Sequence, residues 1–266
     1  MAITTQNGLI AAMATGKTVN FYKGLSTAAA GFVTSLFRIA GLPAAAPAVA
    51  ASPGTALSRT STGAMFIPPA SLTSYITNYE GVSGSTGTMV LADRLVEVGG
   101  LSGIVTTAQT VNSVALPARA SAADDVELWL EVFTLAGVTA SASVTASYTN
   151  NLGVAGRTAT LVGGIPATGT PVGRSYQMAL QAGDTGVQSV QTVTIGASTG
   201  VAGNLGIVLR RTMLFGPVVA NNVGFFMGYA ETDLQRLADE ACVELLYIAT
   251  STSTGTIQGN FGVAQG

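Results

Sequence analysis

The stretch that decides the fold runs from 126 to 133 and reads Val-Glu-Leu-Trp-Leu-Glu-Val-Phe. Alternate residues of an extended chain point to opposite faces. One face of this stretch therefore carries only aliphatic side chains, and the other carries Glu127, Trp129, Glu131 and Phe133. This period of two predicts a β-strand. We expect the face with the glutamates and aromatic rings to be semi-exposed or to lie at an interface.

Similar short segments, separated by Gly, Ser and Asn, recur along the chain from Phe66 onward. The tetrapeptide Asn150-Asn151-Leu152-Gly153 predicts a tight turn between two of them. The expected strands cover residues 88–98, 126–133, 141–149, 157–162, 176–180, 189–195, 206–214, 242–250 and 256–263. Many short strands joined by Gly-rich turns indicate a mainly β fold, with a β-sandwich or jelly-roll-like body.

Helical patterns are confined to two short segments. Residues 4–14 predict a short N-terminal helix. Residues 231–241 predict a second helix, with Leu234, Leu237 and Ala241 on one face. We therefore expect less than about a fifth of the chain to be helical, well below the usual third.

The N-terminal part of the chain differs from the rest. Residues 42–53 hold three prolines among alanines, which is typical of an extended connector. The stretch 24–52 looks like a secretory signal, but Arg38 interrupts its apolar part, which favours a helix or strand followed by a linker. We expect residues 1–53 to form an extended Pro/Ala-rich arm that orders on a neighbouring subunit, and residues 54–266 to form the β-rich body.

The composition excludes several classes of protein. Of 266 residues only 9% are charged, against roughly 25% in an average soluble domain, and the net charge is −2. This excludes a nucleic-acid binder that neutralises phosphates and a polybasic membrane-surface protein. The sequence contains no run of about 18 apolar residues, so no transmembrane helix is predicted. The chain is 48% hydrophobic, so it is not disordered. A surface with so few charges has little protection against self-association, which indicates a subunit of an assembly.

Few residues in the sequence are suited to catalysis or metal binding. The chain has no histidine, the usual general base near neutral pH and the commonest metal ligand. Its one cysteine, Cys242, excludes an internal disulfide and a cysteine-built zinc or iron–sulfur site. Cys242 lies in an apolar run, where we expect it to be buried and chemically idle. We expect no catalytic, cofactor-binding or metal site, and no cofactor.

Two motifs resemble functional sites, and their details argue against them. Residues 14–18, Ala-Thr-Gly-Lys-Thr, end like a phosphate-binding loop, but position 11 is alanine where that loop needs glycine. We expect Lys17 to be a solvated turn residue, and neither Lys17 nor Lys23 has a partner that would make it a base for a nucleophile. Glu127 and Glu131 are about 13 Å apart on one strand face. Glycoside hydrolases need about 5–9.5 Å between their carboxylates.

The remaining charges have simpler interpretations. Asp124, Asp125 and Asp184 lie in expected loops without the Asp-x-Asp-x-Asp-Gly series of a calcium site. Asp184 follows a glycine and is expected to be a turn residue. Arg210 and Arg211 point to opposite sides of a strand, where each is expected to form a structural or intersubunit ion pair.

Several segments together resemble a known group of proteins. They are Ala92-Asp93-Arg94-Leu95, Gly100-Leu101-Ser102-Gly103, Thr107-Ala108-Gln109-Thr110-Val111-Asn112, Leu116-Pro117-Ala118-Arg119, Glu127-Leu128-Trp129-Leu130-Glu131-Val132, Ser147-Tyr148-Thr149-Asn150, Gly156-Arg157-Thr158-Ala159-Thr160 and Ala179-Leu180-Gln181-Ala182-Gly183-Asp184-Thr185-Gly186-Val187. In this order and spacing they resemble virion structural proteins of tailed bacteriophages and prophages. The resemblance covers residues 20–266, and its motifs are typical of a scaffold rather than of a catalytic site.

The resemblance implies a non-enzymatic structural protein of the phage particle. The leading interpretation is a capsid decoration or cement protein that stabilises the head by bridging capsomers. It would be made in the host cytoplasm and located in the virion, on the head. It implies a homo-oligomer, with a trimer favoured, and contacts with the major capsid protein or other virion proteins. Direct contact with nucleic acid or a membrane is not implied.

The alternative interpretation is a tail, neck or fibre-adaptor protein. In that case Trp129, its flanking glutamates and the tyrosines are the first candidates for contacts with a receptor or a glycan. A major capsid protein is disfavoured, because the long charged spine helix typical of tailed-phage shell subunits is not visible in the sequence.

Overall fold

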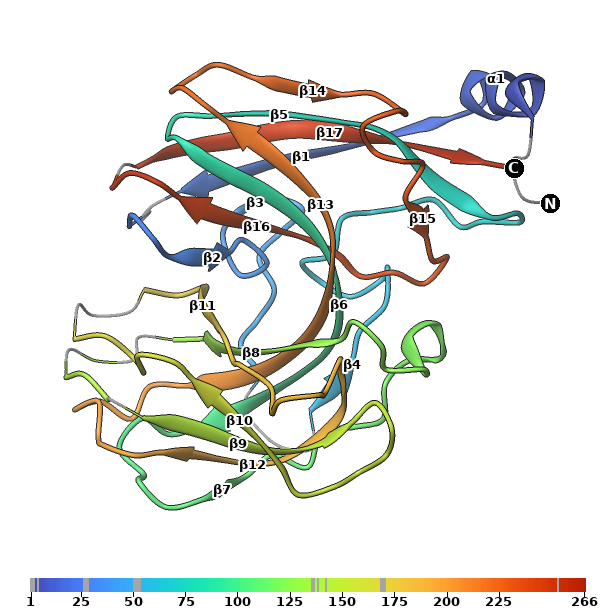
Figure 1. The fold of residues 1–266 in the computed structure, drawn as a ribbon. Helices are drawn as coiled ribbons and strands as arrows, with labels where there is room; N and C mark the ends of the chain where they lie inside the picture. The colour runs from blue at the N-terminus through green and yellow to red at the C-terminus, as the bar shows by residue number, and fades with distance from the viewer. Residues whose placement is uncertain are drawn as a thin grey trace. The chain divides into compact units, whose positions relative to one another are not determined.

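The computed structural model describes residues 3, 5–25, 29–49, 54–134, 137, 139–141, 143–167, 171–252 and 254–266. It is mainly β, with 47% of residues in strands and 5% helical, which confirms the expected fold class (Figure 1). The chain divides into two compact units. Unit 1 comprises residues 1–46, 58–93 and 212–266, and unit 2 comprises residues 47–57 and 94–211.

The strands are distributed between the two units. Unit 1 contains α1 (Gln6–Ala14), β1 (Lys17–Leu25), β2 (Val33–Ser35), β3 (Gly41–Leu42), β5 (Ser74–Ser83), β14 (Phe225–Met227), β15 (Arg236–Leu237), β16 (Val243–Ala249) and β17 (Gly255–Gln265). Unit 2 contains β4 (Thr55–Ala56), β7 (Gln109–Thr110), the 3-10 helix η1 (Ala118–Ala120), β8 (Glu127–Val132), β9 (Val144–Asn150), β10 (Arg157–Leu161), β11 (Arg174–Gln177) and β12 (Val187–Ile195). Two long strands, β6 (Gly87–Leu101) and β13 (Leu205–Val218), contribute residues to both units.

Unit 1 is built on an antiparallel sheet with the strand order β14-β5-β17-β1-β3. β1 pairs with β17 over nine residues, from Lys17 opposite Val263 to Leu25 opposite Gly255. β16 pairs with β2 and with the first half of β6. Side chains from β1, β5 and β17 share one hydrophobic core with side chains from β16 and β6, as expected for a two-layer sandwich.

Unit 2 contains a second antiparallel sheet, β10-β9-β12-β7. In the same unit β8 pairs on one side with β11 and on the other with the first half of β13. The stretch 126–133 thus contains β8, an internal strand. Five of its six residues are buried, so both of its faces are covered and the expected semi-exposed face is wrong.

Most of the strands expected from period-two alternation are present, each within a few residues of its expected ends. The β9–β10 hairpin turns at the expected tetrapeptide, with Arg157 opposite Tyr148. The expected N-terminal helix is α1. Both β1 and β5 were missed. In β1 the inward positions are Val19, Phe21, Lys23 and Leu25, and the lysine hides the alternation. In β5 a register shift against β17 interrupts it.

The helix expected over residues 231–241 is wrong. Asp233 and Leu234 have φ angles of 50° and 45°, which place them in the left-handed region and end any right-handed helical turn. The hydroxyl of Thr232 donates to the carbonyl of Ile76 at 3.0 Å, and Leu237 of β15 pairs with Ser74 of β5. Leu237 in β15 and Ala241 reach the core of unit 1, whereas Leu234 in the turn is only half-buried.

The expected boundary between an arm over 1–53 and a body over 54–266 stays a prediction, and residues 50–53 lie outside the described part of the chain. Within the expected arm, β1 lies between β17 and β3 in the unit 1 sheet. Its side chains Val19, Phe21 and Leu25 are buried in the unit 1 core. Any test of the arm must therefore separate β1 from the residues that precede it.

Two truncated chains, one without residues 1–16 and one without residues 1–53, separate the contribution of β1 from that of the residues before it. We expect deletion of residues 1–16 to leave the melting temperature nearly unchanged, because among the residues described there only Ala12 is buried. Deletion of residues 1–53 should lower it strongly, since burying each large apolar side chain of β1 contributes about 1.5–3 kcal/mol. Thermal melts followed by circular dichroism measure both. Equal melting temperatures for the two truncated chains would instead support a dispensable arm.

Candidate functional site

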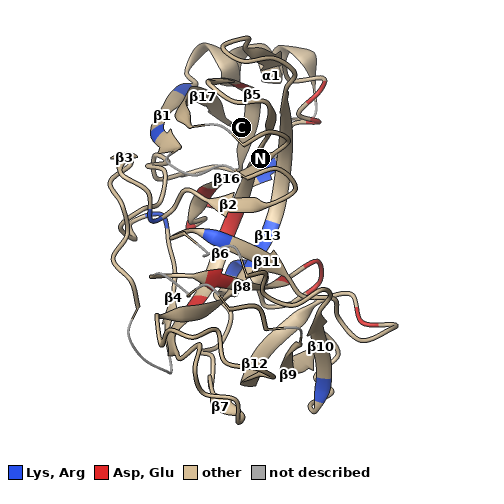
Figure 2. Ribbon diagram, turned by 90° about the vertical axis from the view of Figure 1, so that its left-hand side faces the viewer, with Lys and Arg blue, Asp and Glu red and all other residues tan. Residues whose placement is uncertain are grey.

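Unit 2 contains a buried cluster of charged side chains centred on Glu131 of β8. Arg94 of β6 donates from Nη1 to Glu131 Oε2 and from Nη2 to Oε1, both at 2.9 Å, which is a two-pronged ion pair. Arg94 also donates from Nε and Nη2 to Glu97 Oε2 at 3.0 and 2.9 Å. Arg210 of β13 donates to Glu131 Oε2 at 2.7 Å, and the hydroxyl of Ser175 donates to the same oxygen at 3.1 Å. Figure 2 shows these oppositely charged residues on β6, β8 and β13.

The cluster balances its charge inside the protein. Two guanidinium groups face two carboxylates, and the side chains of Arg94, Arg210 and Glu131 are fully buried. The Arg210 guanidinium also lies 4.9 Å from the centre of the Trp129 ring, a cation–π contact. The Trp129 indole Nε1 donates to Glu127 at 2.7 Å. Such a group is stable in the interior only while each charge keeps its partner.

Substitution of Glu131 tests this dependence. Glu131→Gln removes the negative charge that two buried guanidinium groups share, and we expect a loss of about 3–5 kcal/mol in the free energy of unfolding. Glu127→Gln is the matched control on the same strand face. Its side chain is only partly buried, and a glutamine oxygen can still accept from Trp129. Chemical denaturation measures both variants, and equal stability of the two would contradict the role assigned to Glu131.

A second polar cluster in unit 2 surrounds Asp184. Arg157 of β10 donates from Nε and Nη2 to the two carboxylate oxygens at 2.8 and 3.0 Å. Asn150 of β9 donates to Oδ1 at 2.7 Å, and the Tyr148 hydroxyl donates to Oδ2. The Tyr148 oxygen in turn accepts the backbone N–H of Gln181 at 3.0 Å. Asp184 therefore ties the 181–184 loop to the β9–β10 hairpin, which is more than the expected turn role.

These contacts shift the ionisation of the cluster. The hydrogen bonds from Arg157, and then those from Tyr148 and Asn150, hold the pKa of Asp184 well below its usual value. Burial, together with the hydrogen bond to Asp184, raises the pKa of Tyr148. Asp184 is thus ionised and Tyr148 neutral at any ordinary pH, and both act as fixed hydrogen-bonding groups.

The Asp184 shift predicts a pH dependence. Because its pKa is lower in the folded than in the unfolded chain, the stabilisation is complete above the ordinary value of 3.8 and is lost as pH falls through the folded value. Asp184→Asn should therefore reduce stability at pH 7 and flatten the decline of stability below about pH 4. Denaturant unfolding at pH 7, 4 and 3 measures the difference. A parallel decline in wild type and variant would contradict it.

In unit 1 the only buried lysine is Lys23, which sequence reasoning left without a partner. Its side chain is 1% exposed, and Nζ donates to the carbonyls of Ile39 and Pro43 at 2.9 and 2.7 Å. The ammonium group therefore holds the segment around β3 against β1. Burial lowers the pKa of Lys23 from 10.5 to about 8.

The lowered pKa of Lys23 has a measurable consequence. Between a pH of about 8 and 10.5 the unfolded chain binds a proton that the folded chain has released, so the free energy of unfolding contributed by Lys23 rises with pH. Lys23→Met should lack this rise. Subtracting the stability of the variant from that of the wild type at pH 7, 8, 9 and 10 removes the titration of the tyrosines. A difference that stays constant over this range would contradict the shift.

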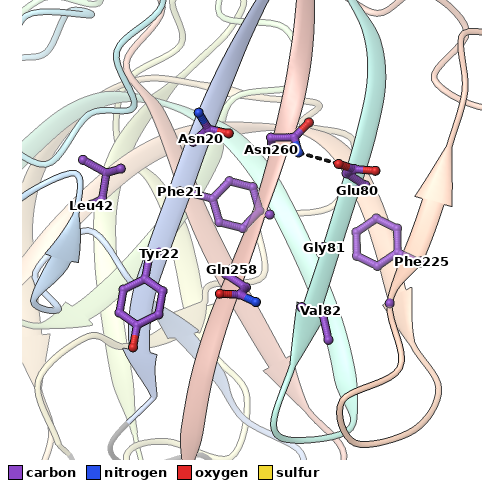
Figure 3. A pocket seen from close by; sticks show the side chains of 12 residues that line it. Asn20, Phe21, Tyr22, Leu42, Glu80, Gly81, Val82, Phe225, Gln258 and Asn260 are labelled. Atoms are coloured by element: carbon purple, nitrogen blue, oxygen red, sulfur yellow. Dashed lines mark hydrogen bonds between the residues drawn. The ribbon is translucent and has the colours of Figure 1, made fainter.

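The outer face of the unit 1 sheet carries a hollow with a volume of about 490 Å³. Three central strands form its floor, with Asn20 opposite Asn260 and Asn260 opposite Glu80 in one row. The next row places Tyr22 opposite Gln258 and Gln258 opposite Val82. Figure 3 shows Leu42 and Tyr22 on one side of the floor and Phe225 on the other.

Glycines beneath the hollow let the core approach the sheet. Gly259 lies over the ring of Phe21, and a Cβ atom at Gly259 would come within 2.6 Å of the ring and 2.2 Å of the Glu80 carbonyl oxygen. The floor is therefore formed by backbone at this point, with the amide side chains of Asn20, Gln258 and Asn260 standing around it. Gln258 and Asn260 lie on the expected strand over 256–263, but the sequence did not single them out, because their neighbours Asn20 and Glu80 lie on β1 and β5, which were missed.

The structure places the remaining sequence-based candidates as follows. Trp129 is only 6% exposed, so it offers little surface for the receptor or glycan contact that the alternative interpretation places there. Lys17 is exposed at the start of β1, after a helix, which is the reverse of the strand–loop–helix order of a phosphate-binding loop. Cys242 is fully buried, as expected, and its chemical idleness stays a prediction.

Asp124, Arg210 and Arg211 each bond to a neighbouring group in the structure. Asp124 accepts a hydrogen bond from Asn151 at 2.7 Å, and its carbonyl accepts one from Arg211 at 3.0 Å. Asp125 has a φ angle of 56°, in the left-handed region. Arg210 forms the structural ion pair expected of it. Among the described residues no group of three or more His, Cys, Asp or Glu side chains is arranged to hold a metal ion. Within the same residues, no helix is long and apolar enough to cross a membrane.

The chain was compared with protein families, curated proteins and solved structures. No family model and no curated protein matches the chain. Among solved structures, the VP2 subviral particle of infectious bursal disease virus matches at 10% identity over 94% of this chain and 81% of that chain, with a TM-score of 0.20. The structure of the Gt strain of that virus matches with the same identity and coverage and a TM-score of 0.22. TM-scores of this size carry no argument about the fold or function of this chain.

Proposed function

We propose that the chain is a non-enzymatic virion structural protein of a tailed phage, and specifically a capsid decoration or cement protein that bridges capsomers on the head. The observation that carries the proposal is the placement of its charges. Of the 11 basic and 13 acidic side chains, nine are buried. They are Lys23, Arg38, Asp93, Arg94, Glu97, Glu131, Arg174, Arg210 and Glu244. The other 15 of these 24 side chains are not buried, so the surface is as poor in charge as the sequence.

Large apolar side chains are exposed on this weakly charged surface. In unit 1 they include Phe66, Phe215 and Phe226, and in unit 2 they include Leu152 and Val162, each more than half exposed. Exposed apolar groups with few charges around them favour association with other protein surfaces. A contact of standard size buries about 1,600 Å² in total, enough to add stability to a shell lattice.

The buried clusters support a scaffold role for the segments that resemble phage structural proteins. Those segments span residues 92–187 and contain Arg94, Glu131, Arg157 and Asp184. Each of these charges is engaged in one of the two clusters of unit 2. The two carboxylates among them, Glu131 and Asp184, thus hold strands and loops together.

The proposed location is tested on the particle itself. Purified virions are disrupted gently, heads and tails are separated, and each fraction is analysed by mass spectrometry, with the major capsid and tail-tube proteins as markers. We expect the chain in the head fraction. Recovery with tails alone would overturn the decoration role and favour the tail, neck or fibre-adaptor alternative. Absence from both fractions would overturn the virion proposal.

The proposed homo-oligomer, with a trimer favoured, is tested in solution. Interfaces formed by uncharged surface are insensitive to salt, because at 1 M ionic strength charges are screened beyond about 3 Å while apolar contacts remain. We expect light scattering of the purified chain to give the same oligomeric mass in 0.1 M and 1 M NaCl. Dissociation at high salt would show that the few surface charges hold the assembly together.

A further inference from the structure

We propose that the hollow on the unit 1 sheet, lined by Asn20, Tyr22, Glu80, Gln258 and Asn260, binds a neutral oligosaccharide. This inference goes beyond the structural role proposed above and does not depend on a position on head or tail. The volume of the hollow, about 490 Å³, lies in the range of about 300–1,000 Å³ that is usual for small-ligand sites.

The floor offers hydrogen-bonding groups in a regular array. Each side-chain amide has two donors and an acceptor oxygen, and a carboxylate accepts at both oxygens. Asn20 and Gln258 are exposed, and Asn260 donates to Glu80, which fixes that carboxylate in place (Figure 3). Neighbouring strands are about 4.8 Å apart, and the two rows lie about 6.8 Å apart along each strand. The spacing between strands is comparable to the distance between non-adjacent hydroxyl groups on one sugar ring, and the spacing between rows is longer than one ring.

The sides of the hollow are suited to the other surface of a sugar. Tyr22 is 45% exposed and Leu42 is 56% exposed, and they pair across β1 and β3. On the opposite side lies Phe225, whose half-buried ring packs against Tyr79 of the unit 1 core. Pyranose rings present C–H groups on their faces and hydroxyl groups around their edges. The apolar side formed by Tyr22 and Leu42 and the amide floor therefore match the two kinds of surface that one oligosaccharide presents.

Charge selects among possible ligands. The lining contains no lysine or arginine, and its one ionisable acidic group is Glu80. A phosphate, a nucleic acid or an acidic polysaccharide would meet a carboxylate without a compensating cation, which is unfavourable. A neutral glycan meets no such repulsion, and Glu80 accepts from its hydroxyl groups.

The site is rigid before a ligand arrives. All of the floor residues lie on β1, β5 and β17, which are paired along most of their lengths. Sites built on strands hold side chains in place better than sites on loops, and a preorganised site loses less entropy on binding.

The test uses the purified full-length chain and a defined panel of probes. The panel is maltohexaose, cellohexaose, laminarihexaose and chitohexaose as neutral glycans, with hexagalacturonic acid as the anionic counterpart. Saturation-transfer NMR detects binding, and isothermal titration calorimetry gives the affinity. Tyr22→Ala and Gln258→Ala are the site variants. Thr18→Ala and Thr256→Ala are matched controls, because both threonines are exposed on the same strands and face outside the hollow.

We expect at least one neutral hexasaccharide to bind, with an affinity that falls at least tenfold in each site variant and stays within twofold in each control. Thermal melts should be alike for all four variants, since the substituted side chains are exposed. Three results of the binding measurements would overturn the proposal. They are no binding of any neutral probe, equal binding by site and control variants, and tighter binding of hexagalacturonic acid. A fall in oligomeric mass in the site variants would also overturn it, by showing that the hollow is covered by a second copy.

Discussion

Glu131 is the carboxylate on which the interior of unit 2 depends. A single oxygen of this side chain accepts from Arg94, Arg210 and Ser175, which come from β6, β13 and β11. An ion of this kind is costly to remove from water, and the cost is offset only when every partner is in position. The requirement fixes the relative placement of four strands more narrowly than aliphatic packing alone, because hydrogen bonds fail within a few tenths of an ångström.

The same use of charge extends through the molecule. Asp184 joins a loop to the β9–β10 hairpin, and Lys23 joins the β3 segment to β1. In each case a charged group is satisfied by nearby partners within one unit instead of by water. A chain with only 9% charged residues, nine of them buried, has a surface made mostly of amides, hydroxyls and apolar side chains. Such a surface is suited to contact with neutral partners, whether other protein subunits or, in the hollow of unit 1, a glycan.

Sequence patterns located most of the strands because burial on one or both faces leaves a period-two signature in composition. They did not locate β1, where Lys23 occupies an inward position, or β5, where a register shift interrupts the period. The false helix over 231–241 shows the reverse effect. Apolar residues there recur at helical spacing, but the backbone passes through left-handed residues, and Leu237 reaches the core from β15. Local periodicity reports which residues are buried, and it does not report by which backbone path they arrive there.

The sequence by itself determined the β-rich class, the absence of histidine and disulfide chemistry, and the shortage of charge, because these follow from residue types and their local spacing. Only the tertiary structure decided which charges are partners. Arg94, Glu131 and Arg210 are separated by 37 and 79 residues, and Asn20, Glu80 and Asn260 come from three distant segments. Strand order brings such residues together, and it is set by pairing between segments far apart in the sequence, which local patterns do not encode.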